Sequence, residues 1–104
     1  MAQVTVVYWR DIPAQVIVKA GRKAAKRELS AKFQEAIDMA AMRAKAIGTD
    51  AYLNDWRRDV VAECDGDLEG EADKWLTQLY SDYDDARVDA LVANKGYAKE
   101  NSDA

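Results

Sequence analysis

Residues 4–27, VTVVYWRDIPAQVIVKAGRKAAKR, decide the fold of this chain. Two apolar runs within it, residues 4–9 and 15–19, are rich in β-branched and aromatic side chains, which is the composition of β-strands. Between the runs Pro13 fixes its own φ angle and pushes Ile12 toward an extended conformation. The stretch therefore predicts two strands joined by a turn.

The first run carries apolar side chains at almost every position. Because side chains alternate along a strand, one face would hold Val4, Val6 and Tyr8 and the other Thr5, Val7 and Trp9. A strand that is apolar on both faces is typical of the centre of a sheet that is covered on both sides. We therefore expect residues 4–9 to form a central, doubly covered strand.

Two helices follow in the pattern of the next segment. Ser30 is a candidate N-cap, and apolar residues recur behind it at three- and four-residue spacing as far as Ile47, with Gly48 as the stop. Thr49 and Asp50 offer a second cap, ahead of a short helix on which Tyr52, Leu53 and Trp56 share a face. Residues 22–28 lack an apolar face and predict either a solvated helical turn or an extended basic loop.

The C-terminal half predicts one long helix. Asp67 is its expected cap, and an apolar stripe runs from Leu68 to Ala90 before the helix stops at residues 94–96. The sequence leaves open whether the aromatic part of this stripe, from Trp75 to Tyr83, is core or interface. It also leaves open whether residues 60–64 form a third strand or an extended connector.

These elements predict a single α+β domain. A small antiparallel sheet, built on the N-terminal strand pair, would pack against two or three helices within residues 1–96, and residues 97–104 would form a polar C-terminal tail. A chain of 104 residues has no room for two independent cores. The oligomeric state does not follow from the sequence.

The composition excludes several kinds of chemistry. The chain has no histidine, which removes histidine-based acid–base catalysis and histidine metal sites. Its one cysteine, Cys64, forms no internal disulfide and cannot build a zinc or iron–sulfur site alone. Asp82, Asp84 and Asp85 do not share one helix face, so we expect no metal site there. We expect no cofactor and no catalytic residues, and an enzyme acting through carboxylates, lysine, arginine or tyrosine is the less favoured interpretation.

Location follows from what the sequence lacks. Its longest apolar runs are far too short to span a bilayer, and the N-terminus shows no signal-peptide pattern. Together with the single cysteine, these observations predict a cytoplasmic protein without membrane contact.

Positive charge is concentrated in one segment. Residues 1–48 carry nine Lys and Arg against four acids, whereas residues 49–104 carry six against fifteen. The candidate anion-binding residues are Lys19, Arg22, Lys23, Lys26 and Arg27. A solvated surface segment, an anionic small molecule or protein partner, and nucleic acid are the alternatives. Nucleic acid is the least favoured, because the sequence pI is about 4.8 and no aromatic side chain lies among these cations.

The turn between the two strands is the second candidate site. Trp9, Arg10, Asp11 and Pro13 place an aromatic ring, a cation and a carboxylate together at a strand end, where binding residues often lie. The hypothesis is that they bind a protein partner. The alternative is structural, with Trp9 in the core and a local ion pair between Arg10 and Asp11.

Three stretches carry a family resemblance: VVYWRDIPAQVIVKAGRKAAKREL, FQEAIDMAAMRA and DAYLNDWRR. They lie within residues 6–58, and on them the chain resembles a small bacterial family of "virulence factor" domain proteins. Ser30 stands where relatives are expected to have proline. The resemblance implies a stand-alone protein or a module of longer chains, with no established activity or catalytic residues.

The resemblance also implies a place beside enzymes of tetrahydrofolate-linked methyl transfer, because some relatives lie near such genes. With the basic and aromatic surface, this favours a non-catalytic accessory subunit that docks on a larger cytoplasmic enzyme. A regulatory module that senses an anionic metabolite is the first alternative, and nucleic-acid binding is the second.

Overall fold

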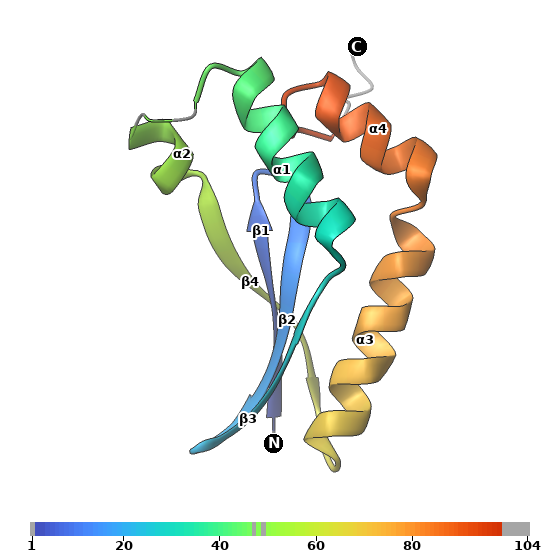
Figure 1. Cartoon of the computed structure of the whole chain (residues 1–104). Helices are drawn as coiled ribbons and strands as arrows, with labels where there is room; N and C mark the ends of the chain where they lie inside the picture. The colour runs from blue at the N-terminus through green and yellow to red at the C-terminus, as the bar shows by residue number, and fades with distance from the viewer. Residues whose placement is uncertain (1, 47, 49, 99–104) are drawn as a thin grey trace.

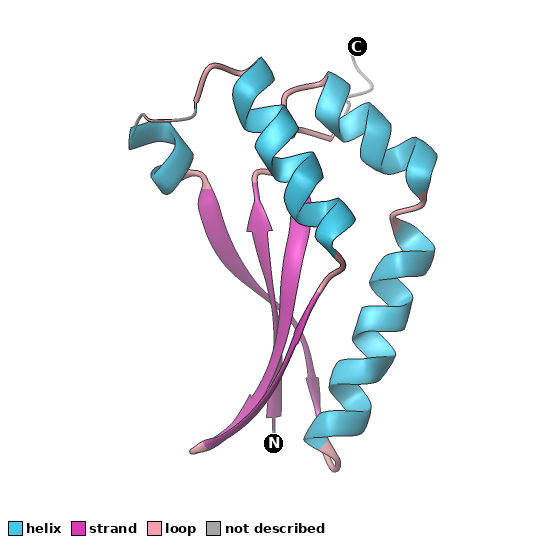
Figure 2. Ribbon diagram, viewed as in Figure 1, coloured by secondary structure: helices cyan, strands magenta, loops and turns pink. Residues whose placement is uncertain are grey.

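A computed structural model describes residues 2–46, 48 and 50–98 of the chain. The elements, in order, are β1 (Ala2–Trp9), β2 (Ile12–Ala20), β3 (Lys23–Glu28), α1 (Ala31–Arg43), α2 (Asp50–Asn54), β4 (Trp56–Cys64), α3 (Leu68–Asp82) and α4 (Asp85–Ala93). Figures 1 and 2 show a twisted sheet with α3 along one side and α1 and α4 together at one end. The predicted fold class is confirmed: within the described residues an antiparallel sheet built on the N-terminal strand pair packs against helices, of which α3 and α1 contact β2.

The sheet has four strands in the order β3-β2-β1-β4, and every neighbouring pair is antiparallel. The N-terminal strand pair lies at its centre, as predicted, because β1 pairs with both β2 and β4. The register places Val4 opposite Val18 and Val6 opposite Val16. All four of these valines are completely buried, so they form the middle of the core.

Helix α3 covers one face of the sheet, packing against β2 and β3. The strand residues on that face, among them Val4, Val6 and Ala25, are buried, and Ala72 and Leu79 are the buried residues of α3. Sheet and helix thus bury their apolar sides against each other, the usual two-layer arrangement.

The other face of the sheet is covered only at one end. Trp9 is completely buried there, but Thr5 and Val7 are half-buried and Val60, beside Thr5 on β4, is 56% exposed. The prediction that β1 is covered on both sides is therefore wrong for most of its length. The reason is that no described helix packs over this half of the sheet.

Residues 22–28 contain strand β3, where the sequence predicted a helical turn or a basic loop. After the turn at Gly21, which has a φ of +60°, the chain pairs back along β2 with Ala25 opposite Val18. Ala25 supplies the strand's buried side chain. Backbone pairing with β2, rather than an apolar pattern of its own, makes this segment a strand.

Helix α1 begins after Ser30 as predicted, but the expected side-chain cap is absent. The Ser30 side chain makes no capping hydrogen bond; instead its backbone N–H donates to the Tyr80 hydroxyl at 2.8 Å. The helix ends at Arg43, before the expected stop at Gly48, and Ile47 and Thr49 lie outside the described residues.

Residues 60–64 belong to a strand, which settles the alternative that the sequence left open. β4 begins at Trp56 and pairs with β1, with a bulge where Thr5 faces Val60 and Val4 faces Ala62. Trp56 was expected on the short helix, but α2 ends at Asn54. Pairing with the edge of β1 therefore starts earlier than local pattern indicated.

The predicted long helix is two helices. α3 ends at Asp82, and α4 begins after Asp84, whose side chain accepts a hydrogen bond from the Arg87 backbone N–H at 2.9 Å. The predicted cap at Asp67 is confirmed, because its side chain accepts from the Glu69 N–H. The aromatic stripe packs mainly inward: Trp75 and Tyr83 are partly buried against the core, while Tyr80 is 39% exposed.

Tyr97 and Ala98, the first residues of the predicted polar tail, are held against the body of the protein, and residues 99–104 lie outside the described residues. None of the described helices is both long and apolar enough to cross a membrane.

Candidate functional site

The turn between β1 and β2 is fixed to distant parts of the chain. Arg10 occupies it with a φ of +54°, a left-handed conformation that is uncommon for a residue with a side chain. Its backbone N–H donates to the Asp55 carbonyl at 3.0 Å, and the Asp11 N–H donates to the Gly96 carbonyl at 2.8 Å. These two bonds compensate for a strained turn by satisfying its backbone donors.

The side chain of Arg10 is enclosed between two aromatic rings. Its guanidinium carbon lies 4.6 Å from the ring centre of Trp9 and 4.7 Å from that of Tyr97. Nε donates to Asp55 at 2.8 Å, and a terminal nitrogen donates to the Lys95 carbonyl at 2.7 Å. With 11% of its side chain exposed, this cation is paired and hydrogen-bonded, as a nearly buried charge must be.

Asp11 completes this connection. One of its carboxylate oxygens accepts from the Ala98 backbone N–H at 2.6 Å, and the other lies 3.3 Å from Arg57. We call the contacts of Arg10 and Asp11 with residues 95–98 the C-terminal clamp. It joins the N-terminal hairpin to the segment after α4.

Two of the predicted partner-binding residues lie inside the protein. Trp9 and Pro13 are both completely buried, and the Trp9 ring N–H donates to the Tyr52 carbonyl at 2.9 Å. Arg10 and Asp11 lie closer to the surface, with 11% and 32% of their side chains exposed. Binding of a partner at this turn stays a prediction, and it depends on Asp11 and the rim of Arg10 rather than on Trp9.

The five predicted anion-binding residues are brought to one hairpin, β2–β3, but they do not converge. Lys19 and Lys26 face the uncovered side of the sheet, as the register on β2 and β3 requires. Arg22 lies in the turn, and Lys23 faces the other side with Arg27. Of the five, only Arg27 is partly buried; the other four are exposed or in the exposed turn.

Arg27 is already neutralised within the chain. It forms ion pairs with Glu69 and Asp73 on α3, and its hydrogen bonds to these carboxylates raise the pKa of the guanidinium. Across the described residues, no ion pair involves the other four cations of the segment. Arg27 therefore fastens β3 to α3, while the hairpin carries unneutralised charge.

A pair of tyrosines that the sequence did not single out as a cluster lies between β1, β4 and the α3–α4 junction. The guanidinium of Arg57 lies 4.5 Å from the Tyr8 ring centre, and that of Arg87 lies 4.1 Å from the Tyr83 ring centre. Burial, followed for Tyr8 by the neighbouring Tyr83, raises the pKa of both phenols. Arg57 also bonds to Asp11, so this cluster extends the C-terminal clamp rather than forming an open site.

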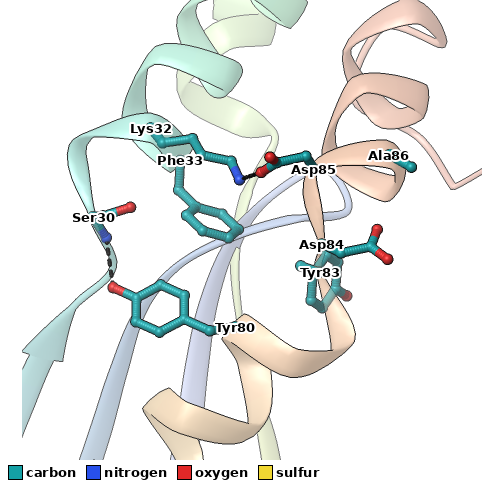
Figure 3. Close-up of a pocket in the computed structure, with 8 residues that line it drawn as sticks. All are labelled: Ser30, Lys32, Phe33, Tyr80, Tyr83, Asp84, Asp85 and Ala86. Carbon is teal, nitrogen blue, oxygen red and sulfur yellow. Dashed lines mark hydrogen bonds and ion pairs between the residues drawn. The ribbon is translucent and has the colours of Figure 1, made fainter.

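A shallow hollow of about 490 Å³ lies where α1 begins beside the α3–α4 junction, and Figure 3 shows the side chains that line it. Its polar atoms take part in structural contacts: Ser30 donates to Tyr80, Lys32 pairs with Asp85, and Asp84 caps α4. The rings of Phe33 and Tyr80 lie 5.7 Å apart along its wall. We interpret this hollow as the seam between α1 and the two C-terminal helices.

The acidic residues of the α3–α4 junction each make a different structural contact. Asp82 accepts from Gln78, Asp84 caps α4 and Asp85 pairs with Lys32. Within the part of the chain that the structure describes, no three histidine, cysteine or acidic residues are grouped so that they could hold a metal ion.

The fold and the C-terminal clamp define a small two-layer α+β protein whose most distinctive residues join the β1–β2 turn to the segment after α4. A family model described as "Virulence factor" matches residues 7–92. The chain therefore belongs to that family, as the resemblance of residues 6–58 predicted. Comparison with curated proteins and with solved structures gives no match.

Proposed function

We propose that this protein is a non-catalytic accessory subunit that docks on a larger protein through its β2–β3 hairpin. One observation carries the proposal: Lys19, Arg22, Lys23 and Lys26 gather on this hairpin and, among the described residues, form no ion pair with an acid of their own chain. Charge that is left unneutralised on an exposed hairpin steers an acidic partner and aligns it on contact.

The arrangement favours a protein surface over a small anion. A small anion is bound by donors that converge on one point, whereas these cations point to both sides of a two-stranded ribbon. An acidic protein surface can meet such a ribbon along its length. Nucleic acid stays the weakest alternative, because the sequence pI is about 4.8 and no aromatic side chain lies among these cations for bases to stack on.

The candidate partner comes from the family resemblance. Relatives near genes of tetrahydrofolate-linked methyl transfer make a cytoplasmic enzyme of that class the first protein to test. The proposed role there is recruitment or positioning, because the protein's own polar groups near the clamp are engaged in holding the fold.

The proposal is tested by comparing two charge-matched variants. Arg22→Glu with Lys23→Glu changes the hairpin, and Arg43→Glu with Lys45→Glu makes the same change of charge at the end of α1. Quantitative binding to the candidate enzyme, measured by surface plasmon resonance at two salt concentrations, should fall at least tenfold for the hairpin variant only. Equal binding by both variants and the unchanged protein would refute the docking surface.

Two titrations test the alternatives with the unchanged protein. Calorimetric titration with inorganic phosphate and a folate polyglutamate measures anion sensing, and a gel shift at low salt measures nucleic-acid binding, where phosphate contacts are strongest. Salt-sensitive binding in either assay, lost in the hairpin variant, would replace the accessory-subunit proposal with that alternative.

A further inference from the structure

The uncovered face of the sheet presents three rows of side chains across the four strands. The register defines them from β3 to β4: Ala24, Lys19, Gln3 and Glu63; Lys26, Ile17, Thr5 and Val60; Glu28, Gln15, Val7 and Arg58. Eight of these twelve residues are exposed, in contrast to the buried valines on the opposite face.

The middle row is an apolar band on three strands, with Lys26 at its β3 end. Ile17, Thr5 and Val60 lie side by side on β2, β1 and β4, and Val7 adjoins them. Val60 is 56% exposed, and Val61, the extra residue of the β4 bulge, is 37% exposed. Ile17 is only 8% exposed and Thr5 and Val7 are half-buried, so the exposed apolar surface is centred on Val60 and Val61. Exposed apolar side chains grouped on a sheet face are typical of a surface that another protein covers.

One end of this face is closed by helices. The Tyr52 ring of α2 lies 5.8 Å from that of Trp9 and 6.3 Å from that of Trp56, the residues that follow the third row. The start of α1 borders the same end, where Ala31 and Gln34 line a pocket of about 400 Å³ with Val7, Gln15, Glu28 and Trp56. The opposite end, at the β2–β3 turn, lies far from α1 and α2 (Figure 1).

The charges of this face are arranged in a self-complementary way. On β4, Arg58 and Glu63 lie on either side of Val60; on the other half of the face, Glu28 and Lys19 lie on either side of Ile17. Within the described ranges none of these four forms an ion pair. Arg58 and Glu63 therefore lie at opposite ends of β4, and Lys19 and Glu28 lie at opposite ends of the β2–β3 half of the face.

We propose that this face binds a second copy of the chain, so that two sheets pack into a two-fold symmetric sandwich. The two-fold axis runs across the strands through the middle row, and the same patch is used by both copies. The proposal goes beyond docking on a larger protein, because it uses the sheet face, which shares Lys19 and Lys26 with the docking hairpin but does not include Arg22 and Lys23.

In this arrangement the middle row packs against itself, with Val60, Thr5 and Ile17 of each copy near their counterparts. Lys26, at the β3 edge of the row, also lies near its counterpart, and its long exposed side chain keeps the ammonium group in solvent there. The outer rows exchange places, which brings Arg58 near Glu63 of the second copy and Lys19 near Glu28 of the second copy. The open end of each face enters the hollow beneath α1 of the other copy. Both the apolar band and the unpaired charges are thereby covered.

A two-fold axis along the strands is the other way to bring the faces together. It would set the α1 and α2 ends of both copies directly against each other, and these ends rise above the sheet at Trp9 and Trp56. Under that axis Arg58 would meet Glu28 of the second copy instead of Glu63. The two arrangements therefore differ in the acid that pairs with Arg58, and charge-exchange mutations can distinguish them.

Sedimentation velocity of the full chain, over a range of concentrations, tests the dimer. We expect the unchanged protein to dimerise and Val60→Asp to weaken the dimer at least tenfold. Met42→Asp is the matched control, because Met42 is 60% exposed at the C-terminal end of α1, whereas the residues of α1 that border this face, Ala31 and Gln34, lie at its start. A monomer at all concentrations, or equal loss in both variants, would overturn the proposal; binding to another protein through Val60 by a monomer would assign the face to that partner instead.

Charge exchange tests the axis. Arg58→Glu alone and Glu63→Arg alone should each weaken the dimer, and the double variant should restore it. Restoration of Arg58→Glu by Glu28→Arg, and not by Glu63→Arg, would overturn the proposed axis. Arg22→Glu with Lys23→Glu should leave the dimer intact, which keeps the outcome separate from that of docking through the hairpin.

Discussion

Gly96→Ala should destabilise the protein by an amount that the structure separates into two parts. Gly96 has a φ of +95°, and a Cβ added there would lie 2.9 Å from the Trp9 ring and 3.2 Å from the Arg10 side chain. Positive φ costs a residue with a side chain about 1–3 kcal/mol. Overpacking against a rigid buried ring adds about 1–3 kcal/mol, because neither Trp9 nor the enclosed Arg10 can move aside.

Gly66→Ala is the matched control. Gly66 has a φ of +104°, close to that of Gly96, but nothing lies within 4 Å of a Cβ built on it. Gly66→Ala should therefore lose stability only through the unfavourable positive φ, without a steric clash. The difference between the two variants isolates the contact with Trp9 and Arg10, and we expect about 1–3 kcal/mol.

Equilibrium unfolding in urea, followed by tryptophan fluorescence, measures this difference. With a slope of about 1–3 kcal/mol per molar urea, typical of small proteins, the midpoint of Gly96→Ala should lie roughly 1 M below that of Gly66→Ala with an unchanged slope. If the two midpoints coincide, the segment after α4 does not pack on the hairpin as described, and the C-terminal clamp is refuted.

Three further predictions concern contacts elsewhere in the fold. Arg10→Lys keeps the charge but cannot make both side-chain hydrogen bonds, so it should cost about 1.5–3 kcal/mol in the same urea assay; an effect below 0.5 kcal/mol would argue against the enclosed guanidinium. Tyr80→Phe should cost about 1 kcal/mol by removing the acceptor of the Ser30 N–H, whereas Ser30→Ala should be nearly neutral because its side chain makes no cap; the reverse order would restore the predicted Ser30 cap. Burial raises the pKa of Tyr8 and Tyr83 above 10.0, so the folded state holds these protons more tightly than the unfolded chain. The two protonated phenols therefore contribute fully to the free energy of unfolding below pH 10, and this contribution is lost as the pH rises through the raised pKa values. Replacing both tyrosines with phenylalanine should flatten the fall in melting temperature above pH 10, and an unchanged slope would contradict this origin.

The N-terminal strand pair was predictable because its signal is local. Val4, Val6, Val16 and Val18 alternate within their own strands, and β-branched composition with a proline between the runs needs no knowledge of the rest of the chain. The same holds for the cap at Asp67. Each of these features depends on residues that are near neighbours in sequence.

The features that the sequence missed depend on distant partners. β3 buries little beyond Ala25 and is held by backbone pairing with β2 and by Arg27 on α3, which no periodicity records. The break after Asp82 was hidden because the apolar stripe keeps its spacing from α3 into α4. Asp84 was the available signal, because an aspartate is a preferred N-cap residue and can mark the start of a new helix as well as a position on a solvent-exposed helix face.

The candidate sites divide in the same way. The clustering of the five cations on one segment was visible in the sequence. The neutralisation of Arg27 was not, because it depends on Glu69 and Asp73, more than forty residues away. The burial of Trp9 depends on Tyr52 and Gly96, which meet it only in three dimensions.

The C-terminal clamp also constrains the order in which the chain can fold as it is synthesised. Arg10 and Asp11 emerge from the ribosome early, yet their partners at Lys95, Gly96 and Ala98 are among the last described residues to appear. Until then Asp55 can accept from Arg10, but the Asp11 N–H and the terminal nitrogen of Arg10 lack their acceptors at Gly96 and Lys95. The nascent hairpin should therefore stay loosely formed, and native packing should close in one late step.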